Sequence, residues 1–443
     1  MKLQLSSRTL WAISLPIIIA GANETIVDVT DTIFLARYGT IELGAVALAA
    51  TIYEVVSFFT FGLGDGIQII CARRAGQASE RGIGGAFNHG TGLLLATSVV
   101  LFLVIKFASP FATSWLLRSA EVQAAVDAFL GIIAFAVFFH SLNLAYSAFY
   151  VGIARTRVLI GATTALALTN VALDYVLIFG KFGFPELGIR GAAFGSLFAE
   201  IVTFLFLTVY AVWKGDVRRF GLFRLGRPSP TLGRVMLRVS WPVALETLLG
   251  TARWFLFFVI VEHVGEGALA GANIIYSIYA LFLLPIDGFS ETTTTMVSNF
   301  IGQDDSRRIG AVVRRAMGWS AAVVLPFLAL AAAVPELPLA AFTSDPTVLE
   351  GSISSLRVVS LAVMIVIPAE MVFAAVAGTG DTRTTLLIEL VLSTTVLAYV
   401  YSAAIVLGLP LAAIWVGEIL GWLACFMLSL FWLQSERWRR LEI

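Results

Sequence analysis

The sequence predicts an all-α polytopic membrane protein, and three observations support this. Of its 443 residues, 59% are hydrophobic and 13% are charged, and its mean hydropathy is +0.91. Soluble domains are about 45–50% apolar and about 25% charged. Apolar runs of about 20 residues, enough to cross a bilayer, fill most of the chain. The two cysteines exclude a disulfide-rich secreted scaffold, and the apolar excess excludes disorder.

Glycine, proline and charge clusters divide the apolar runs into twelve predicted spans. These cover residues 9–36, 44–70, 88–110, 122–150, 158–180, 188–213, 237–262, 268–297, 311–334, 348–377, 384–407 and 410–433. Several spans exceed the minimum length and are expected to tilt or bend. Pro16 lies inside the first span, where its missing N–H group favours a kink.

The basic residues predict the orientation of the chain. Of the 29 Lys and Arg residues, 22 fall on the same side as the N-terminus and six on the other. Cytoplasmic loops are enriched in Lys and Arg, so we expect both termini in the cytoplasm and a multi-pass protein of the plasma (inner) membrane. No small-residue cleavage site follows the first apolar run, which predicts a retained span. The net charge of zero indicates no nucleic-acid partner.

The chain is a duplication with a constant offset of 226 residues. The offset relates Pro16 to Pro242, Gly76 to Gly302 and Arg157 to Arg383, among other pairs. We therefore predict an N-lobe of six helices (residues 1–213), a cytoplasmic linker (214–236), and a C-lobe of six helices with a short tail (237–443). Six spans per half make the repeats parallel, as in several secondary transporters. A duplicated structural bundle without transport is the alternative.

Carboxylates inside the spans indicate a protein that handles cations. A carboxylate at the bilayer centre costs about 3 kcal/mol, and Arg253 is the one base that the charge count assigns to neither side of the membrane. Some of these acids, such as Asp65, Glu291 and Glu418, could be solvated at the interface. Thirteen acids within the predicted spans are considered as candidates: Glu24, Asp28, Asp31, Glu54, Asp65, Asp174, Glu200, Glu246, Asp287, Glu291, Glu370, Glu389 and Glu418.

Spacing singles out two groups in the first half. Glu24, Asp28 and Asp31 are four and three residues apart, so they share one helix face. Asn170 and Asp174, four apart in the fifth span, also share a face. Neither group has acidic counterparts 226 residues later, which favours a function confined to one half. The alternative is a structural role in helix capping or interhelical hydrogen bonding.

The second half holds three further candidate acids: Glu246, Glu370 and Glu389. Glu246 and Arg253 are seven residues apart on one helix face, which predicts mutual neutralisation. Glu370 follows a proline and Glu389 lies early in the eleventh span, and either could bind a cation or substrate.

Enzyme chemistry is not expected. The three histidines are far apart in sequence and no phosphate-binding glycine loop is present, so we predict no catalytic metal, no ATP hydrolysis and no cofactor. His140, in the fourth span, is either a proton carrier or a buried hydrogen-bonded side chain.

Five fragments together resemble one family, the multidrug and toxic compound extrusion (MATE) transporters, over essentially the full chain. The first half carries LP…VDVTDTIFLARYG, GLGDGIQIICARRAGQ and TNVALDYVLIFGKFGFPELGIRGAAFGS. The second half carries GANIIYSIYALFLLPIDGFSETTTTMVSNFIGQDD and AAVAGTGDTRTT. Their order and their duplication make the resemblance specific.

The resemblance implies two six-helix lobes in a V and export of organic, often cationic, compounds in exchange for H+ or Na+, by a monomer in the bilayer. The VDVTDTIF and Asn-x-x-x-Asp motifs are similar to the DinF-type cation site, which implies H+ or tentatively Na+ at Asp31, Asn170 and Asp174. Ser196 matches a position where DinF-like members carry a Thr. NorM-like members rely instead on C-lobe acids, and Glu370 is near that position. The alternative is a flippase for lipid-linked oligosaccharides or other lipids, which would need several intramembrane bases.

Overall fold

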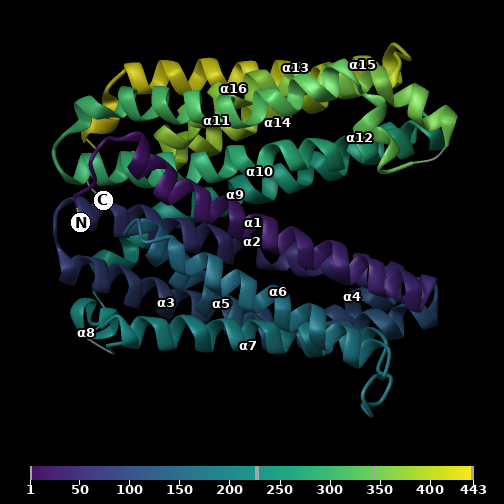
Figure 1. The fold of residues 1–443 in the computed structure, drawn as a ribbon, viewed down its shortest axis with the longest axis horizontal. Coiled ribbons are helices and arrows are strands. Elements are labelled where there is room, and N and C mark those ends of the chain that lie inside the picture. The colour runs from purple at the N-terminus through teal and green to yellow at the C-terminus, as the bar shows by residue number, and fades with distance from the viewer. Residues whose placement is uncertain (1, 225–228, 344, 441–443) are drawn as a thin grey trace. The chain divides into compact units, whose positions relative to one another are not determined.

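A computed structural model, which describes residues 2–224, 229–343 and 345–440, confirms the all-helical class (Figure 1). Within the described residues, twelve helical segments are long and apolar enough to cross a membrane, and each contains one predicted span or nearly all of it. Residues 225–228 of the predicted linker and 441–443 of the predicted tail lie outside the described residues. The twelve segments are Ser7–Tyr38, Thr40–Gly76, Glu80–Leu116, Ala120–Gly152, Arg157–Ile178, Ile189–Trp213, Pro230–Glu262, Glu266–Gly302, Ser306–Ala333, Pro346–Gly378, Thr382–Val406 and Leu411–Gln434.

Many helices extend beyond the predicted apolar limits. Helix α2 ends at Gly76 and α3 starts at Glu80, whereas the apolar pattern ends at residue 70 and resumes at 88. Hydropathy marks only the stretch that crosses hydrocarbon, while backbone hydrogen bonds continue a helix into the polar interface. Serine then caps the new helix, because the Ser79 hydroxyl accepts the Gly82 N–H at 3.1 Å.

The chain forms two compact units. The amino-terminal unit holds residues 15–244 and the carboxy-terminal unit holds residues 2–14 with those from 245 onward. The amino-terminal elements are α1 (Ser7–Tyr38, from Leu15), α2 (Thr40–Gly76), α3 (Glu80–Leu103), a π-helical turn (Val104–Ala108), α4 (Ser109–Leu116), α5 (Ala120–Gly152), α6 (Arg157–Ile178), α7 (Ile189–Trp213), α8 (Asp216–Phe220) and the start of α9. The carboxy-terminal elements are α9 (Pro230–Glu262, from Leu245), α10 (Glu266–Gly302), α11 (Ile309–Ala333), α12 (Glu336–Ala340), α13 (Pro346–Gly378), α14 (Thr382–Tyr401), α15 (Leu411–Ile414) and α16 (Val416–Gln434).

The first turns of α1 complete the carboxy-terminal unit. Ser14 donates its hydroxyl to Thr292 at 2.8 Å, and Trp11 packs edge-on against Phe289 with ring centroids 5.4 Å apart. In the amino-terminal unit, the start of α9 passes so close to α2 that a Cβ on Gly62 would lie 2.6 Å from the Ser240 carbonyl oxygen. Each unit thus includes a helical segment from the other half of the sequence.

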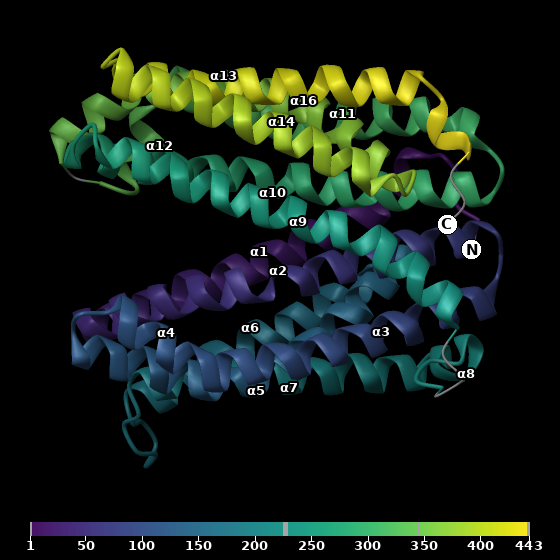
Figure 2. The same cartoon turned by 180° about the vertical axis from the view of Figure 1, so that it is seen from behind.

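Buried aromatic side chains fill the amino-terminal unit near α8. Phe87, Tyr146 and Phe149 are fully buried, and Phe220 of the short helix α8 packs edge-on against Phe149. Figures 1 and 2 both show α8 at one end of this unit, beside α3. Outside the core, large apolar side chains face outward, such as Phe431, which is 71% exposed. Apolar outward faces are what helices in hydrocarbon require.

The backbone repeats with the predicted offset. Helices α2 and α10, and also α5 and α13, have bounds that differ by 226 residues at both ends. Ala78 and Asp304, two residues after the ends of α2 and α10, both have left-handed backbone angles, φ 57° and 61°. A Cβ on Gly152 would lie 2.8 Å from the Gln68 carbonyl oxygen, and one on Gly378 would lie 2.6 Å from that of Thr294, the residue equivalent to Gln68. The two halves therefore share their helix contacts as well as their sequence.

Candidate cation site

Helix α1 runs along α6 in the amino-terminal unit, and two contacts fix its rotation. The Asn23 side-chain amide donates to the Thr163 hydroxyl at 3.0 Å. Three turns further on, Leu35 is fully buried in a cluster with Ile178 and Ala192. Because Asp31 lies one turn before Leu35, its side chain is directed toward the polar face of α6.

All four residues of the predicted cation site come together there. The carboxyl groups of Asp31 and Asp174 lie next to each other, and the Asn170 side chain lies beside Asp31. The Asn170 amide donates to the Ser196 hydroxyl of α7 at 3.4 Å. Asn170 is 1% exposed and Asp174 is fully buried. Sequence spacing alone could not predict the contact between α1 and α6 that brings Asp31 to Asn170 and Asp174.

The two carboxyl groups need a positive charge that the chain does not supply. Within the described part of the chain, both carboxyl oxygens of Asp174, one oxygen of Asp31 and the Asn170 carbonyl oxygen are buried without a hydrogen-bond partner. Two carboxylates about 4 Å apart repel each other by about 4 kcal/mol at an effective dielectric constant of 20. A proton or a small oxygen-preferring cation would remove this repulsion.

Glycines on α7 make room for the buried carboxyl of Asp174. A Cβ at Gly195 would overlap a carboxyl oxygen of Asp174. One turn earlier, a Cβ at Gly191 would lie 2.6 Å from the backbone of Leu177. In the motif GAAFGS, Gly191 therefore allows α7 to pack closely against α6, and Gly195 leaves space for the Asp174 carboxyl.

Glu24 and Asp28 lie on the same helix as Asp31 but contribute differently. Both side chains are exposed within the amino-terminal unit. Asp28 lies within electrostatic range of Asp31 and Glu24, whereas Glu24 is directed toward His140 and Glu200. The Nδ1 atom of His140 lies 2.9 Å from Glu200 Oε1. His140 is thus hydrogen-bonded, and its partner Glu200 is a residue that the sequence did not single out.

The structure corrects the predicted pairing of Arg253 with Glu246. Arg253 Nη1 donates to Glu418 Oε1 at 2.8 Å, and its Nε atom lies 3.8 Å from Glu389 Oε1. Trp422 also donates to Glu418, at 3.1 Å. Glu418 is 1% exposed, so the interpretation that it is solvated at an interface is wrong. The ion pair buries both charges inside the carboxy-terminal unit.

The three candidate acids of the carboxy-terminal unit lie around one thiol. Glu246, Glu370 and Glu389 are all within electrostatic range of Cys425 on α16. Ser290 donates its hydroxyl to Glu370 at 2.8 Å, and Ser393 donates to Glu389 at 2.7 Å. Unlike the Asp31–Asp174 pair, Glu370 and Glu389 each receive a hydroxyl from the chain.

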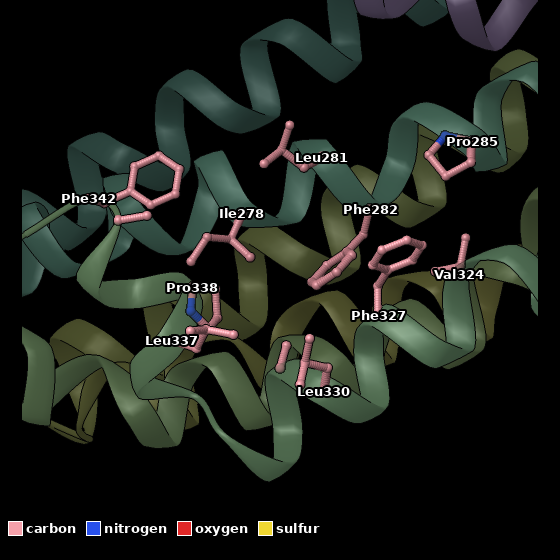
Figure 3. A pocket seen from close by; sticks show the side chains of 12 residues that line it. Ile278, Leu281, Phe282, Pro285, Val324, Phe327, Leu330, Leu337, Pro338 and Phe342 are labelled. Atoms are coloured by element: carbon pink, nitrogen blue, oxygen red, sulfur yellow. The ribbon is translucent and has the colours of Figure 1, made fainter.

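An apolar cavity of about 440 Å³ lies between α10, α11 and α12 (Figure 3). Its lining includes Phe282, Phe327 and Phe342, and all twelve lining side chains are apolar. None of its lining side chains has an oxygen or nitrogen that could bind H+ or Na+, so the cavity is not a part of the cation site.

Comparison with known proteins assigns the family. The model of the family described as MatE matches residues 16–176 and 242–404, two copies offset by 226 at their starts. The "Probable multidrug resistance protein NorM" of Thermotoga maritima is 25% identical over 437 residues, covering 98% of this chain and 93% of that protein. A solved structure described as "Crystal structure of MATE in complex with MaL6" has the same fold, with a TM-score of 0.90, 20% identity and coverage of 97% of this chain and 96% of the other. Another, an "Outward-facing conformation of a multidrug resistance MATE family transporter of the MOP superfamily", has a TM-score of 0.89 at 21% identity, covering 97% and 95%. The chain therefore belongs to the MatE family, the transporters that its sequence motifs resemble.

Proposed function

We propose that this protein is a secondary active multidrug exporter that exchanges organic, often cationic, compounds for H+ or Na+ by alternating access. The observation that carries the proposal is the pair formed by half-buried Asp31 and fully buried Asp174, which has no basic partner within the described residues. The printed name of the Thermotoga maritima relative, a multidrug resistance protein, supports the substrate class.

The coupling site is of the DinF type and consists of Asp31, Asn170, Asp174 and Ser196. One H+ or Na+ bound between the carboxyl groups lowers the charge of the site and removes its internal repulsion. A cationic substrate is then held less strongly and leaves on the outside. One pH unit supplies about 1.4 kcal/mol per proton, and 100 mV adds about 2.3 kcal/mol per charge moved. The fourth oxygen ligand for Na+, if Na+ is the ion, is the Ser196 hydroxyl.

Helix α1 carries the change of state to the rest of the unit. Pro16 lies inside this helix and cannot donate a backbone hydrogen bond, so the helix bends most easily there. When the repulsion at Asp31 is relieved, the segment of α1 between Pro16 and Asp31 is free to shift. We further propose, from the bias of basic residues, that both termini lie in the cytoplasm and that the protein acts as a monomer in the inner membrane.

Lipid flipping is the weaker alternative. Recognition of a lipid phosphate needs intramembrane bases that are free to bind it. Arg253, the base that the sequence offers for this role, is engaged by Glu418 and Glu389.

The test is dye efflux from reconstituted vesicles under an imposed pH gradient and, separately, a sodium gradient. Wild-type protein should respond to one of the two, and Asp31→Asn and Asp174→Asn should each reduce gradient-driven efflux at least tenfold. Asp127→Asn is the matched control, because Asp127 accepts the Thr113 hydroxyl at 2.8 Å and Asn retains an acceptor there. Efflux that ignores both gradients, or full gradient-driven efflux by Asp31→Asn, would contradict the proposal.

A further inference from the structure

A second polar cluster lies in the amino-terminal unit, away from the Asp31–Asp174 pair. Three helices supply it: Glu24 from α1, His140 and Asn143 from α5, and Glu200 from α7. Glu24 and Asp31 are seven residues apart, which is about 10 Å along the helix. The two groups are therefore adjacent but separate.

The carboxylate of Glu200 is held by two side chains of α5. His140 Nδ1 lies 2.9 Å from one of its oxygens, and the Asn143 amide donates to the other at 2.6 Å. Asn143 also donates to the backbone oxygen of Glu200, at 2.9 Å. Asn143 and His140 are one helical turn apart, so both reach the same carboxylate. This clamp fixes the position of the acid and the orientation of the imidazole ring.

The other ring nitrogen of His140 has no partner in the described part of the chain. Its Nε2 atom is buried, and the rings of Tyr53 and Phe61 lie edge-on to the imidazole, with centroids 6.4 and 6.1 Å away. A histidine with a purely structural role would need only the hydrogen bond to Glu200. Here the ring is oriented by a carboxylate through Nδ1, an arrangement that stabilises the imidazolium form.

The charged and titratable groups around His140 are mostly acidic. Glu200 faces it from α7 and Glu24 from α1, with Asp28 next to Glu24, and Tyr53 faces it from α2. Lys106 of the π-helical turn packs against α5, where it donates to the Gly131 carbonyl oxygen at 3.2 Å and lies over Phe135.

Of the other helices packed on α5, α3 meets it beside His140 through Ser98, which donates to Ser141 at 2.7 Å, and has no titratable residue after His89, while α6 directs its acid elsewhere. Asp174 of α6 is paired with Asp31. With neutral histidine, Glu24 and Glu200 give the cluster two negative charges and no permanent positive charge. Uptake of one proton by the imidazole leaves one negative charge, and a second proton on Glu24 leaves none.

We propose that Glu24, His140 and Glu200 form a second proton-binding site, in which the imidazole takes up the proton and Glu200 holds the resulting cation. Asn143 is a positioning residue, because it orients Glu200 and cannot titrate. As a proton site, the cluster stands independently of the transport mechanism. As a second coupling site, it rests on the proposed function, and it would let the exporter draw on more than one proton per cycle.

The first experiment measures proton binding without transport. The chain has three histidines, so the ring carbon signals of histidine-labelled protein in detergent micelles can be resolved and assigned with His140→Gln. Between pH 5 and 8, the range in which an unperturbed histidine titrates, the His140 signal should shift in wild type and in Asp31→Asn alike. A His140 signal that stays fixed across this range would overturn the proposal, and so would a shift that Asp31→Asn abolishes.

The second experiment counts protons during transport. His140→Gln keeps a side-chain donor for Glu200 but cannot become charged, and Asn143→Ser is the control that loosens the clamp without removing a titratable group. We expect His140→Gln to lower the number of protons moved per dye molecule and to change the pH profile of efflux, and Asn143→Ser to preserve the ratio. An unchanged ratio and pH profile in His140→Gln would refute the coupling role. Loss of all gradient-driven transport in wild type would refute the proposed function instead, and would leave the titration result intact.

Discussion

Removal of the positive charge of Arg253 tests how the carboxy-terminal unit tolerates a buried acid. The Arg253 and Glu418 side chains are 7% and 1% exposed and form an ion pair at 2.8 Å. In Arg253→Met, Glu418 keeps the Trp422 donor at 3.1 Å and the Tyr279 hydroxyl at 3.4 Å, but it loses its counter-charge. Breaking a buried pair in this way costs about 3–5 kcal/mol, because the remaining charge stays desolvated.

The assay is equilibrium unfolding in mixed micelles with increasing sodium dodecyl sulfate, followed by tryptophan fluorescence. Arg253→Met should lose about 3–5 kcal/mol of unfolding free energy. The double variant Arg253→Met with Glu418→Gln should regain at least half of that loss, because the amide needs no counter-charge. The control is Arg308→Met, at an exposed pair with Asp305 (side chains 46% and 33% exposed), where we expect a loss below about 1 kcal/mol.

The refuting results are specific. If Arg253→Met unfolds like wild type, the buried pair contributes nothing to stability. If the double variant is as unstable as Arg253→Met alone, the loss comes from the space vacated by the arginine rather than from the unpaired charge.

Two further predictions follow from the geometry. Gly195→Ala should reduce gradient-driven efflux at least tenfold, because its Cβ displaces the Asp174 carboxyl. Gly92→Ala is the control: its Cβ meets open space, so this variant should transport normally and gain up to about 1 kcal/mol of stability. Normal efflux by Gly195→Ala would show that the position of Asp174 is unimportant. At the start of α13, Thr347 donates to Asp345 through its N–H group at 2.9 Å and its hydroxyl, which lowers the pKa of Asp345 below its ordinary value. That stabilisation is present at neutral pH and is lost as the pH falls through the folded-state pKa, so Asp345→Ala should destabilise the protein near pH 7 but not in strong acid; equal destabilisation at both pH values, measured by unfolding, would contradict this.

The fold was largely predictable, because its signals are local or periodic. Apolar length gave the twelve spans, and the gapless offset gave two matching halves, down to the identical lengths of α2 and α10. What hydropathy could not give was the helix ends, such as Gly76, because a helix continues where the apolar run stops.

The candidate sites were predictable only in part, because their partners are distant in sequence. Helical spacing grouped Asn170 with Asp174, and the family resemblance added Asp31. Spacing misled at Arg253 and Glu246, because seven residues place two side chains about 10 Å apart along a helix, too far for direct contact. The actual partner, Glu418, is 165 residues away and is found only by the packing of α16. His140 and Glu200, 60 residues apart, were likewise brought together by tertiary structure.

The placement of residues 2–14 has a practical consequence for work on separate halves. A gene cut in the linker would yield a second fragment deprived of the segment that carries Trp11 and Ser14, and a first fragment deprived of Ser240 and its neighbours. Each fragment would lack one helical segment of the compact unit that it has to form. The two fragments should therefore accumulate only when both are made in the same cell. Because each fragment depends on the other, the pair could serve as a split-protein reporter of assembly.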